Sequence, residues 1–198
     1  MTVQLLLASG SSRRRELLDQ IGLEYEVFGA AVDETALAGE AAADYVCRIA
    51  LEKARWAASA TRTHLPVLAA DTAVVLNGQI MGKPADTDHA ADMLRRLSGQ
   101  THKVYSAVSL LLPAGIEDLR LSISEVTFGP IDERWIAFYC AIKEPMDKAG
   151  AYAIQGRAAQ HISRLAGSYS GVMGLPLFET ADLLRCAGIP LLPEVNLN

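Results

Sequence analysis

The chain of 198 residues has few of the features that mark several classes of protein. Its cysteines, Cys47, Cys140 and Cys186, stand far apart and leave one thiol over in any disulfide scheme. This spacing matches neither a zinc motif nor a disulfide framework, so we expect buried, free thiols in a reducing cytoplasm. No apolar run approaches the roughly 20 residues that cross a bilayer, and the N-terminus lacks a signal-peptide pattern. We therefore expect a cytoplasmic protein with no membrane partner.

Positive charge and aromatic side chains are also scarce. The formal net charge is −5 and aromatic residues make up 6% of the chain. Proteins that bind nucleic acid usually carry a basic face, often with aromatic side chains on which bases stack. We therefore expect no nucleic-acid partner, although a local group of Arg and Lys side chains can still hold a small anion.

The chain does begin with a strand and a loop suited to phosphate. The apolar residues 5–8 indicate a buried strand, which Ser9 and Ser11 follow in a tight turn before an amphipathic helix. Unpaired N–H groups at a helix start favour anions, and Arg13 and Arg14 add positive charge there. With one glycine and no Gly-Lys-Ser/Thr, the segment is neither a dinucleotide fingerprint nor a Walker loop. Phosphate binding and ordinary helix capping are the two interpretations.

Strand-like and helix-like segments then alternate along the chain. We predict strands at 25–28, 67–76, 104–112, 119–128 and 162–165, and helices at 44–60, 87–97, 132–141 and 177–186. Asp44 and Asp132 are the expected helix caps, and Asn77-Gly78 marks a hairpin. This order predicts an α/β fold with a mixed sheet and two lobes around a ligand cleft. Because no linker or repeat interrupts it, we expect residues 1–198 to form a single domain.

Two residues stand out against this pattern. Asp71 follows the apolar residues 67–70, and strand-like residues continue after it, so a carboxylate interrupts a buried strand. Sheets of α/β proteins often place catalytic groups at such points, whereas the alternative is a turn or cap residue. Lys53 falls in the apolar stripe that contains Ile49 and Ala57 on the predicted helix. Its side chain either snorkels to the surface or points its ammonium into a cleft.

Further polar residues lie in turns. Lys83 stands between a glycine and a proline, which make a stiff mount for one ammonium group. The acidic pair Asp33-Glu34 offers a second carboxylate ligand. Gln155 follows a run of small residues, and its amide both donates and accepts hydrogen bonds, as the reading of a base edge requires. In each case the alternative is a solvated turn or loop.

Taken in order, these segments resemble the Maf family of nucleoside triphosphate pyrophosphatases, which is distantly related to the inosine triphosphate pyrophosphatases. The matching segments cover almost the whole chain and are 7–14, 32–34, 52–54, 70–72, 82–84, 147–152, 154–156, 167–169 and 174–177. No single segment is decisive, but the ordered set is specific. The resemblance implies an elongated mixed sheet flanked by helices, and a homodimer.

The resemblance also implies a reaction. It is hydrolysis between the α and β phosphates, which yields a nucleoside monophosphate and pyrophosphate, with Mg²⁺ as the metal and Mn²⁺ as the alternative. Asp71 matches the catalytic proton acceptor, and Glu34, Lys53 and Lys83 match other polar residues of the pocket. The residues expected to hold the phosphate chain are Ser9, Ser11, Arg13 and Arg14. Asp71 and Glu34 are the implied metal ligands, and which of them acts as base stays open.

Three positions separate substrate types within the family. Here they hold Arg13, Thr72 and Gln155, which resembles the branch acting on dTTP and UTP. The branch acting on 7-methyl-GTP typically carries Trp, Gln and Glu instead. The alternatives are the same reaction on 7-methyl-GTP, or a nucleotide-binding regulator of cell division and septum formation, with or without turnover. If the substrates are dTTP and UTP, the protein could also clear modified pyrimidine nucleotides.

Overall fold

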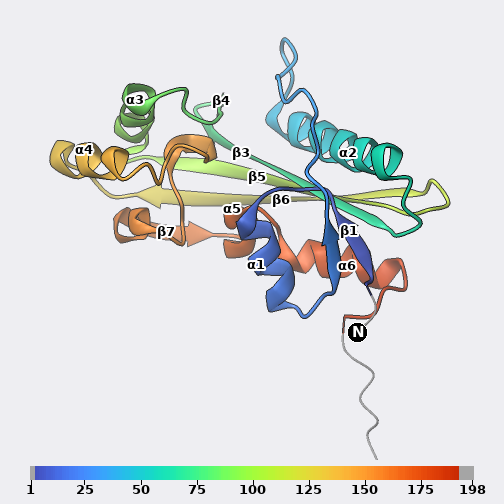
Figure 1. Cartoon of the computed structure of the whole chain (residues 1–198). Coiled ribbons are helices and arrows are strands. Elements are labelled where there is room, and N and C mark those ends of the chain that lie inside the picture. Colours follow the sequence, from blue (N-terminus) through green and yellow to red (C-terminus); the bar gives the residue numbers. More distant parts are fainter. Residues whose placement is uncertain (1–2, 192–198) are drawn as a thin grey trace, which may run out of the picture. The chain divides into compact units, whose positions relative to one another are not determined.

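The computed structural model describes residues 3–191 (Figure 1). Its strands are β1 (Leu5–Leu7), β2 (Tyr25–Val27), β3 (Val67–Leu76), β4 (Gln79–Met81), β5 (Thr101–Leu111), β6 (Glu117–Phe128) and β7 (Ile162–Ala166). Its α-helices are α1 (Ser12–Gln20), α2 (Ala42–Thr61), α3 (Thr87–Leu97), α4 (Glu133–Ala141), α5 (Tyr169–Met173) and α6 (Leu177–Cys186). Short 3₁₀ helices cover Ala149–Ala151 and Arg157–His161. Residues 1–2 and 192–198 of the predicted domain lie outside the described residues.

The strands form a mixed sheet, as predicted. Hydrogen bonds join them in the order β2-β1-β3-β5-β6-β7, and β4 pairs with β3. β1 runs parallel to β2 and β3, whereas β4 is antiparallel to β3 and β7 is antiparallel to β6. Asn77 and Gly78 join β3 to β4 with φ angles of 51° and 78°. These left-handed conformations are those of a two-residue hairpin turn, so the predicted hairpin is confirmed.

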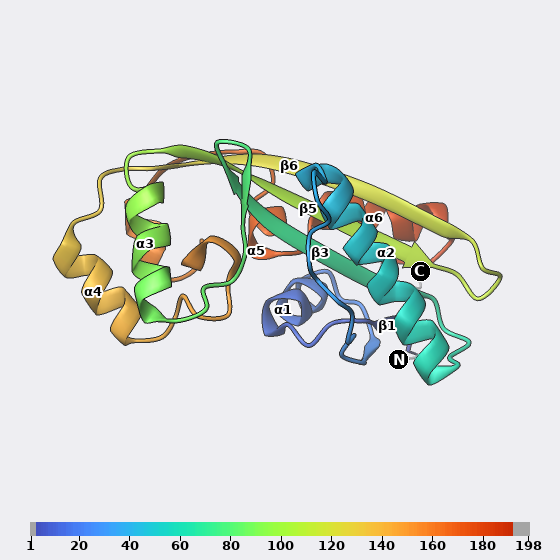
Figure 2. The same ribbon diagram turned by 90° about the horizontal axis from the view of Figure 1, so that it is seen from above.

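The chain forms two compact units, and the first contains the start of the sheet. It comprises the described residues within Met1–Asp71, Ala107–Leu121 and Gly174–Asn198. In this unit α2 and α6 lie on opposite faces of the strands (Figure 1), and Figure 2 shows α2 crossing over β3. Ala54 and Ala57 of α2 pack against Leu6, Val67 and Ala69. Because alanine side chains are small, the helix backbone lies close to the sheet.

The second unit has a core of its own. It comprises Thr72–Ser106 and Ser122–Met173, so β3, β5 and β6 contribute residues to both units. Here α3 packs against α4 and against Ala149–Ala151. The buried aromatic residues Phe128, Tyr139 and Tyr152 belong to this core, which therefore rests on larger side chains than the alanine-rich packing under α2.

Most predicted elements are confirmed, with changes at their ends. α3 and α6 begin and end as predicted, and Asp132 caps α4 by accepting a hydrogen bond from the N–H of Trp135. Asp44 is not a cap, because α2 begins at Ala42 after an N-cap residue, Ala41, that makes no side-chain hydrogen bond. Asp44 instead lies in the first turn, where a negative charge still complements the helix dipole.

The cysteines are free, but they are not uniformly buried. Cys140 is buried, Cys47 is partly buried and Cys186 is exposed, so the prediction of buried thiols was wrong for Cys186. That residue ends α6, beyond the buried Leu183 and Leu184. Within residues 3–191, no helix combines the length and apolarity needed to cross a membrane.

Candidate active site

A buried ion pair lies at the centre of the candidate site. The ammonium nitrogen of Lys53 lies 2.8 Å from Oδ1 of Asp71 and 2.6 Å from Oε1 of Glu34. Lys53 and Asp71 are 6% and 5% exposed, whereas the side chain of Glu34 is 40% exposed. The ammonium therefore joins a buried carboxylate to one that solvent reaches. Lys53 does not snorkel to the surface.

The local structure explains why these residues meet. β3 runs without a break from Val67 to Leu76, so Asp71 lies inside a buried strand and is neither a turn nor a cap residue. On α2 the buried stripe includes Ile49, Lys53 and Ala57, and this stripe faces the sheet. A lysine on the packed face of a helix and an aspartate on a packed strand therefore point toward each other.

Asp71 has one carboxylate oxygen without a hydrogen-bond partner among residues 3–191. Oδ1 accepts a hydrogen bond from Lys53, while Oδ2 is buried and has no hydrogen-bond partner among the described residues. Burial raises the pKa of Asp71, and the positive charges of Lys53 and Arg14 oppose that shift. A buried polar atom that the protein leaves unsatisfied often has a functional role. Its lone pairs suit the acceptance of a proton or the coordination of a cation.

The predicted phosphate turn precedes α1. Ser9 Oγ accepts hydrogen bonds from the N–H of Ser11 at 3.2 Å and from Nη1 of Arg14 at 3.1 Å. Nε of Arg14 donates to the carbonyl of Gly174 at 2.8 Å, so the guanidinium is fixed within the protein. Burial lowers the pKa of Arg14, and the charge of Asp71 opposes that change.

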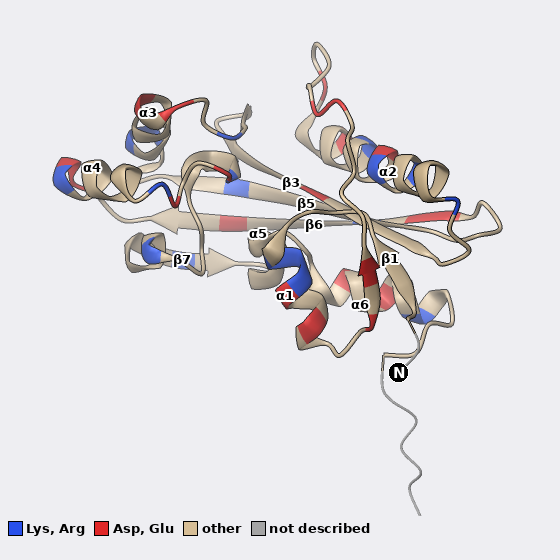
Figure 3. Cartoon of the chain, in the orientation of Figure 1, with Lys and Arg blue, Asp and Glu red and all other residues tan. Residues whose placement is uncertain are grey.

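The same turn leaves the helix start without a side-chain cap. Ser11 is the N-cap residue of α1, but its side chain makes no capping hydrogen bond, so ordinary capping does not explain the serine. Arg13, in the first turn, is partly buried. Figure 3 shows basic residues at the start of this helix. The first turn of α1 contains no acidic residue, so no side chain there neutralises the positive end of the helix dipole.

Of the acidic pair, only Glu34 joins the site. The carboxylate of Asp33 accepts hydrogen bonds from the N–H and the hydroxyl of Thr35 at 2.9 and 2.6 Å. The hydroxyl of Tyr45 donates to the backbone carbonyl of Glu34 at 2.9 Å. Arg48 donates to the carbonyl of Thr35 at 3.1 Å. Tyr45 and Arg48, which hold this loop, were missed by the sequence analysis; their i, i+3 spacing on one helix face was the available signal.

The remaining predicted residues belong to the second unit. Thr72 follows Asp71 on β3, and its Oγ1 lies 3.1 Å from Oγ of Ser106. Lys83 is exposed in the segment between β4 and α3, and Gln155 is exposed after the buried Ile154. The first unit thus brings together Ser9, Arg14, Glu34, Lys53 and Asp71, and the second carries Thr72, Lys83 and Gln155.

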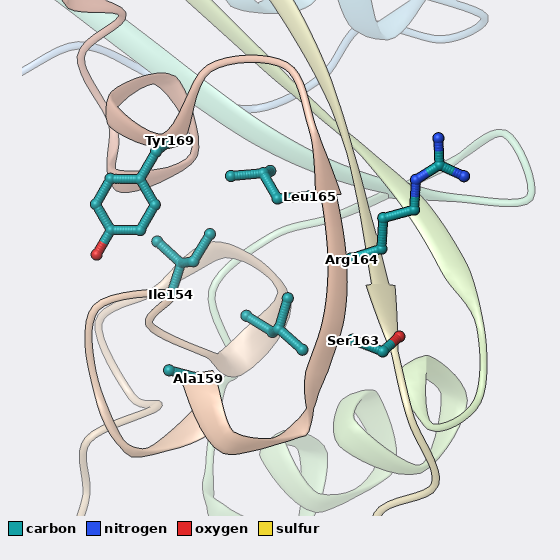
Figure 4. A pocket seen from close by; sticks show the side chains of 7 residues that line it. Ile154, Ala159, Ser163, Arg164, Leu165 and Tyr169 are labelled. Carbon is teal, nitrogen blue, oxygen red and sulfur yellow. The ribbon is translucent and has the colours of Figure 1, made fainter.

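A hollow in the second unit lies beside the segment that carries Gln155. Its volume is about 270 Å³, and its lining residues are Ile154, Ala159, Ile162, Ser163, Arg164, Leu165 and Tyr169. In Figure 4 the guanidinium of Arg164 points away from the side chains of Ile154 and Tyr169. The lining contains no carboxylate, so this hollow does not supply the acid–base chemistry.

The carboxylates fit a magnesium ion better than a metal that needs a full protein cage. No cluster of three or more His, Cys, Asp or Glu side chains occurs within the described residues. Mg²⁺ usually keeps several waters and takes one or two carboxylates together with substrate phosphates. The unpaired Oδ2 of Asp71 and the partly exposed carboxylate of Glu34 meet that requirement.

Comparison with known proteins identifies the family. The model of the family described as Maf-like protein matches residues 4–187. The chain belongs to the Maf family. A Maf relative from Methylococcus capsulatus, named dTTP/UTP pyrophosphatase, is 53% identical over 94% of this chain and 92% of its own length. Another, of the same name, from Escherichia coli K12 is 49% identical over 91% of each chain.

Solved structures share the fold of this Maf-family chain. A HAM1 protein from Coxiella burnetii superposes with a TM-score of 0.54 at 16% identity, over 93% of this chain and 99% of its own. The Ham1 protein of Staphylococcus aureus has a TM-score of 0.51 at 14% identity, with the same coverage. At these identities the likeness shows the fold alone. It confirms the predicted mixed α/β fold, which this chain shares with these Ham1 proteins.

Proposed function

We propose that this Maf-family protein hydrolyses dTTP and UTP to the nucleoside monophosphate and pyrophosphate. The observation that carries the proposal is the buried Asp71 carboxylate, with Oδ1 on Lys53 and Oδ2 unpaired among the described residues. Relatives named dTTP/UTP pyrophosphatase, about half identical over almost the whole chain, support this substrate class.

The chain's polar residues divide into three tasks. Asp71 accepts the proton of the attacking water through Oδ2, and Lys53 holds that carboxylate in place through Oδ1. The groups that bind the phosphate chain are Ser9, Ser11, Arg13 and Arg14 at the start of α1, with Lys83 as a further cation. The substrate base is read by Thr72 and Gln155.

Hydrolysis begins with the attack of water on phosphorus. The oxygen of water forms a bond to phosphorus, the phosphoanhydride bond between the α and β phosphates breaks, and its electron pair leaves with pyrophosphate. Asp71 takes the water proton. A carboxyl group with a raised pKa suits this role, because a base works best when its pKa is near the working pH. Positioning and charge neutralisation provide most of the catalysis in such transfers.

Glu34 would be the direct ligand of Mg²⁺ or Mn²⁺, and Asp71 would contribute its negative charge beside the ion, because its free oxygen, Oδ2, takes the water proton. A bound divalent ion supplies positive charge that neutralises the phosphates and the departing pyrophosphate. Before an ion binds, Lys53 holds the carboxylates of Asp71 and Glu34 close together, because its ammonium contacts both.

The test is pyrophosphate release with Mg²⁺ from a panel of dTTP, UTP, CTP, dCTP, GTP, ATP, ITP and 7-methyl-GTP. Release confined to dTTP and UTP supports the reaction and the substrate class. Release from 7-methyl-GTP instead keeps the reaction and overturns the assignment of Thr72 and Gln155. If no nucleotide is cleaved while dTTP still binds, the protein is a nucleotide-binding regulator.

Three further expectations stay predictions. They are the cytoplasmic location, the homodimer and the single domain over residues 1–198. Sedimentation of the purified protein with and without dTTP would test the second of these.

A further inference from the structure

The residue expected to read the base, Gln155, lies at the tip of a tight turn. The N–H of Gly156 donates to the carbonyl of Ala153 at 3.1 Å and closes the turn. Ala153 and Ile154 are 5% and 6% exposed, whereas Gln155 is exposed. The backbone is thus anchored in the core, and the amide side chain leaves it at one point.

Two side chains outside the turn hold both of its ends. The N–H of Ala153 donates to the hydroxyl oxygen of Tyr139 at 3.2 Å, and the N–H of Arg157 donates to Oε1 of Glu144 at 3.0 Å. The hydroxyl of Tyr139 in turn donates to the same Oε1 at 2.9 Å. We call Tyr139 and Glu144 the turn clamp. One carboxylate oxygen thereby connects the residue before the turn to the residue after it.

The clamp rests on a rigid support. Tyr139 is fully buried on α4, and its ring stacks on Trp135 with centroids 4.5 Å apart. Burial raises the pKa of Tyr139, so its hydroxyl keeps its proton and remains a donor to Glu144. Lys148 donates to the backbone carbonyl of Glu144 at 2.7 Å, which fixes the carboxylate's own backbone.

The absence of a side chain at Gly156 leaves room for the Glu144 carboxylate. A Cβ atom at position 156 would lie 1.9 Å from Oε1 of Glu144, which is far inside any contact distance. The φ angle of Gly156 is −98°, a value that any residue adopts, so a larger residue here would meet the Glu144 carboxylate and not backbone strain. The carboxylate occupies the volume that a side chain at position 156 would fill.

We propose that Glu144 is a positioning residue for substrate selection, which acts by fixing the turn that presents Gln155 to the base. The inference rests on the proposed function, in which Gln155 reads dTTP and UTP. An amide can distinguish base edges only if its donor and acceptor stay in place, because displacement of about 1 Å already weakens such readout strongly. Glu144 does not touch the substrate in this account; it acts through the backbone of the turn.

The first experiment compares Glu144→Ala with Glu144→Gln by measuring kcat and KM for dTTP, UTP, CTP and GTP. Loss of hydrogen bonds from Tyr139 and Arg157 should lower the preference for dTTP over CTP and GTP by about tenfold in Glu144→Ala, mostly through KM. Glu144→Gln keeps an acceptor oxygen, so its preference should stay within about twofold of the wild type. An unchanged preference in folded Glu144→Ala overturns the inference.

The second experiment uses the contact with Gly156. Gly156→Ala should displace the Glu144 carboxylate and reproduce the loss of preference. In the Glu144→Ala background the space is vacated, so Gly156→Ala should add little, and the two losses should not be additive. Gly129→Ala is the matched control, because a Cβ there meets only the carbonyl of His161 at 3.7 Å. Additive losses would contradict the proposed clamp.

Two measurements separate the possible failures. Thermal melting shows whether each variant is folded at the assay temperature, and Tyr139→Phe, which removes only the hydroxyl, replaces Glu144→Ala if that variant unfolds. Tyr139→Phe should also lower the preference for dTTP. If the wild type cleaves no nucleotide, the proposed function fails. If the wild type is selective and the folded clamp variants are equally selective, this inference alone fails.

Discussion

The ammonium of Lys53 lies 2.8 Å from Oδ1 of Asp71, and both side chains are almost fully buried. One residue comes from the packed face of α2 and the other from the middle of β3. Burial of an unpaired charge is costly. The charge of each residue offsets the cost of burying the other. The ammonium supplies the opposite charge that lets the Asp71 carboxylate remain inside the core.

Lys53→Met should lower the free energy of unfolding by about 3 kcal/mol, because it leaves Asp71 buried without its cation. Adding Asp71→Asn to Lys53→Met should recover much of this loss, since the uncompensated charge is then gone. Urea unfolding of both single variants and the double variant measures the coupling. Lys103→Met, at an exposed lysine, is the control and should change stability by less than about 0.5 kcal/mol. Equal stabilities of Lys53→Met and Lys53→Met/Asp71→Asn would contradict the account.

Asp71→Asn should reduce kcat for dTTP by about 10²- to 10⁴-fold, because an amide cannot take the water proton. Pyrophosphate release under saturating dTTP measures the change. The matched control is Asp33→Asn, since Asp33 bonds only locally to Thr35 and its loss should leave turnover near that of the wild type. Near-normal turnover of Asp71→Asn would remove Asp71 from its proposed role.

Gln155→Glu should weaken the preference for dTTP and UTP more than it weakens chemistry. The carboxylate replaces an amide that both donates and accepts with a group that only accepts. We expect kcat/KM for dTTP to fall by about tenfold, with kcat changing less. Steady-state kinetics on dTTP, UTP and 7-methyl-GTP check this, and an unaltered substrate profile counts against Gln155 as the base reader.

His102 should make the stability of the protein depend on pH. It is 2% exposed, its Nε2 lies 2.8 Å from the hydroxyl oxygen of Tyr152, and burial lowers its pKa from 6.5 to about 4. Between these values the unfolded chain binds a proton that the folded chain does not. Folding is therefore favoured fully above pH 6.5, and the contribution is lost as the pH falls toward 4.

Protonation of His102 in the unfolded chain should lower the free energy of unfolding by about 3 kcal/mol at low pH. Denaturant unfolding at a series of pH values should show a smaller slope in His102→Gln than in the wild type. The exposed His64 gives the control, and His64→Gln should keep the wild-type slope. Parallel slopes for His102→Gln and the wild type would show that His102 does not carry the effect.

Much of the fold was predictable because local patterns carry it. The apolar side chains of α3 recur within three turns of chain, and the left-handed Asn77 and Gly78 of the hairpin are adjacent residues. The ends of α2 were less predictable, since Asp44 is as suitable for a first turn as for a cap. The short α5 carries no strong periodic signal over its five residues.

The candidate site divides in the same way. The residue types and their order were enough to name Asp71, Lys53 and Glu34 as candidates and to suggest the family. Sequence left open whether the ammonium of Lys53 reaches the surface or points into a cleft, because a long side chain within an apolar stripe can do either. It singled out Glu34 over Asp33 only through the family resemblance, and it contained no sign that Glu144 lies against Gly156.

The sequence by itself therefore determined most of the elements, the family and most of the polar residues of the candidate site. Only the tertiary structure decided which of these residues act together. Arg14 bonds to Gly174 across 160 residues of chain, and Lys53 bonds to Asp71 across 18. Such contacts depend on the packing of whole helices and strands against one another, and the preferences of neighbouring residues do not encode that packing.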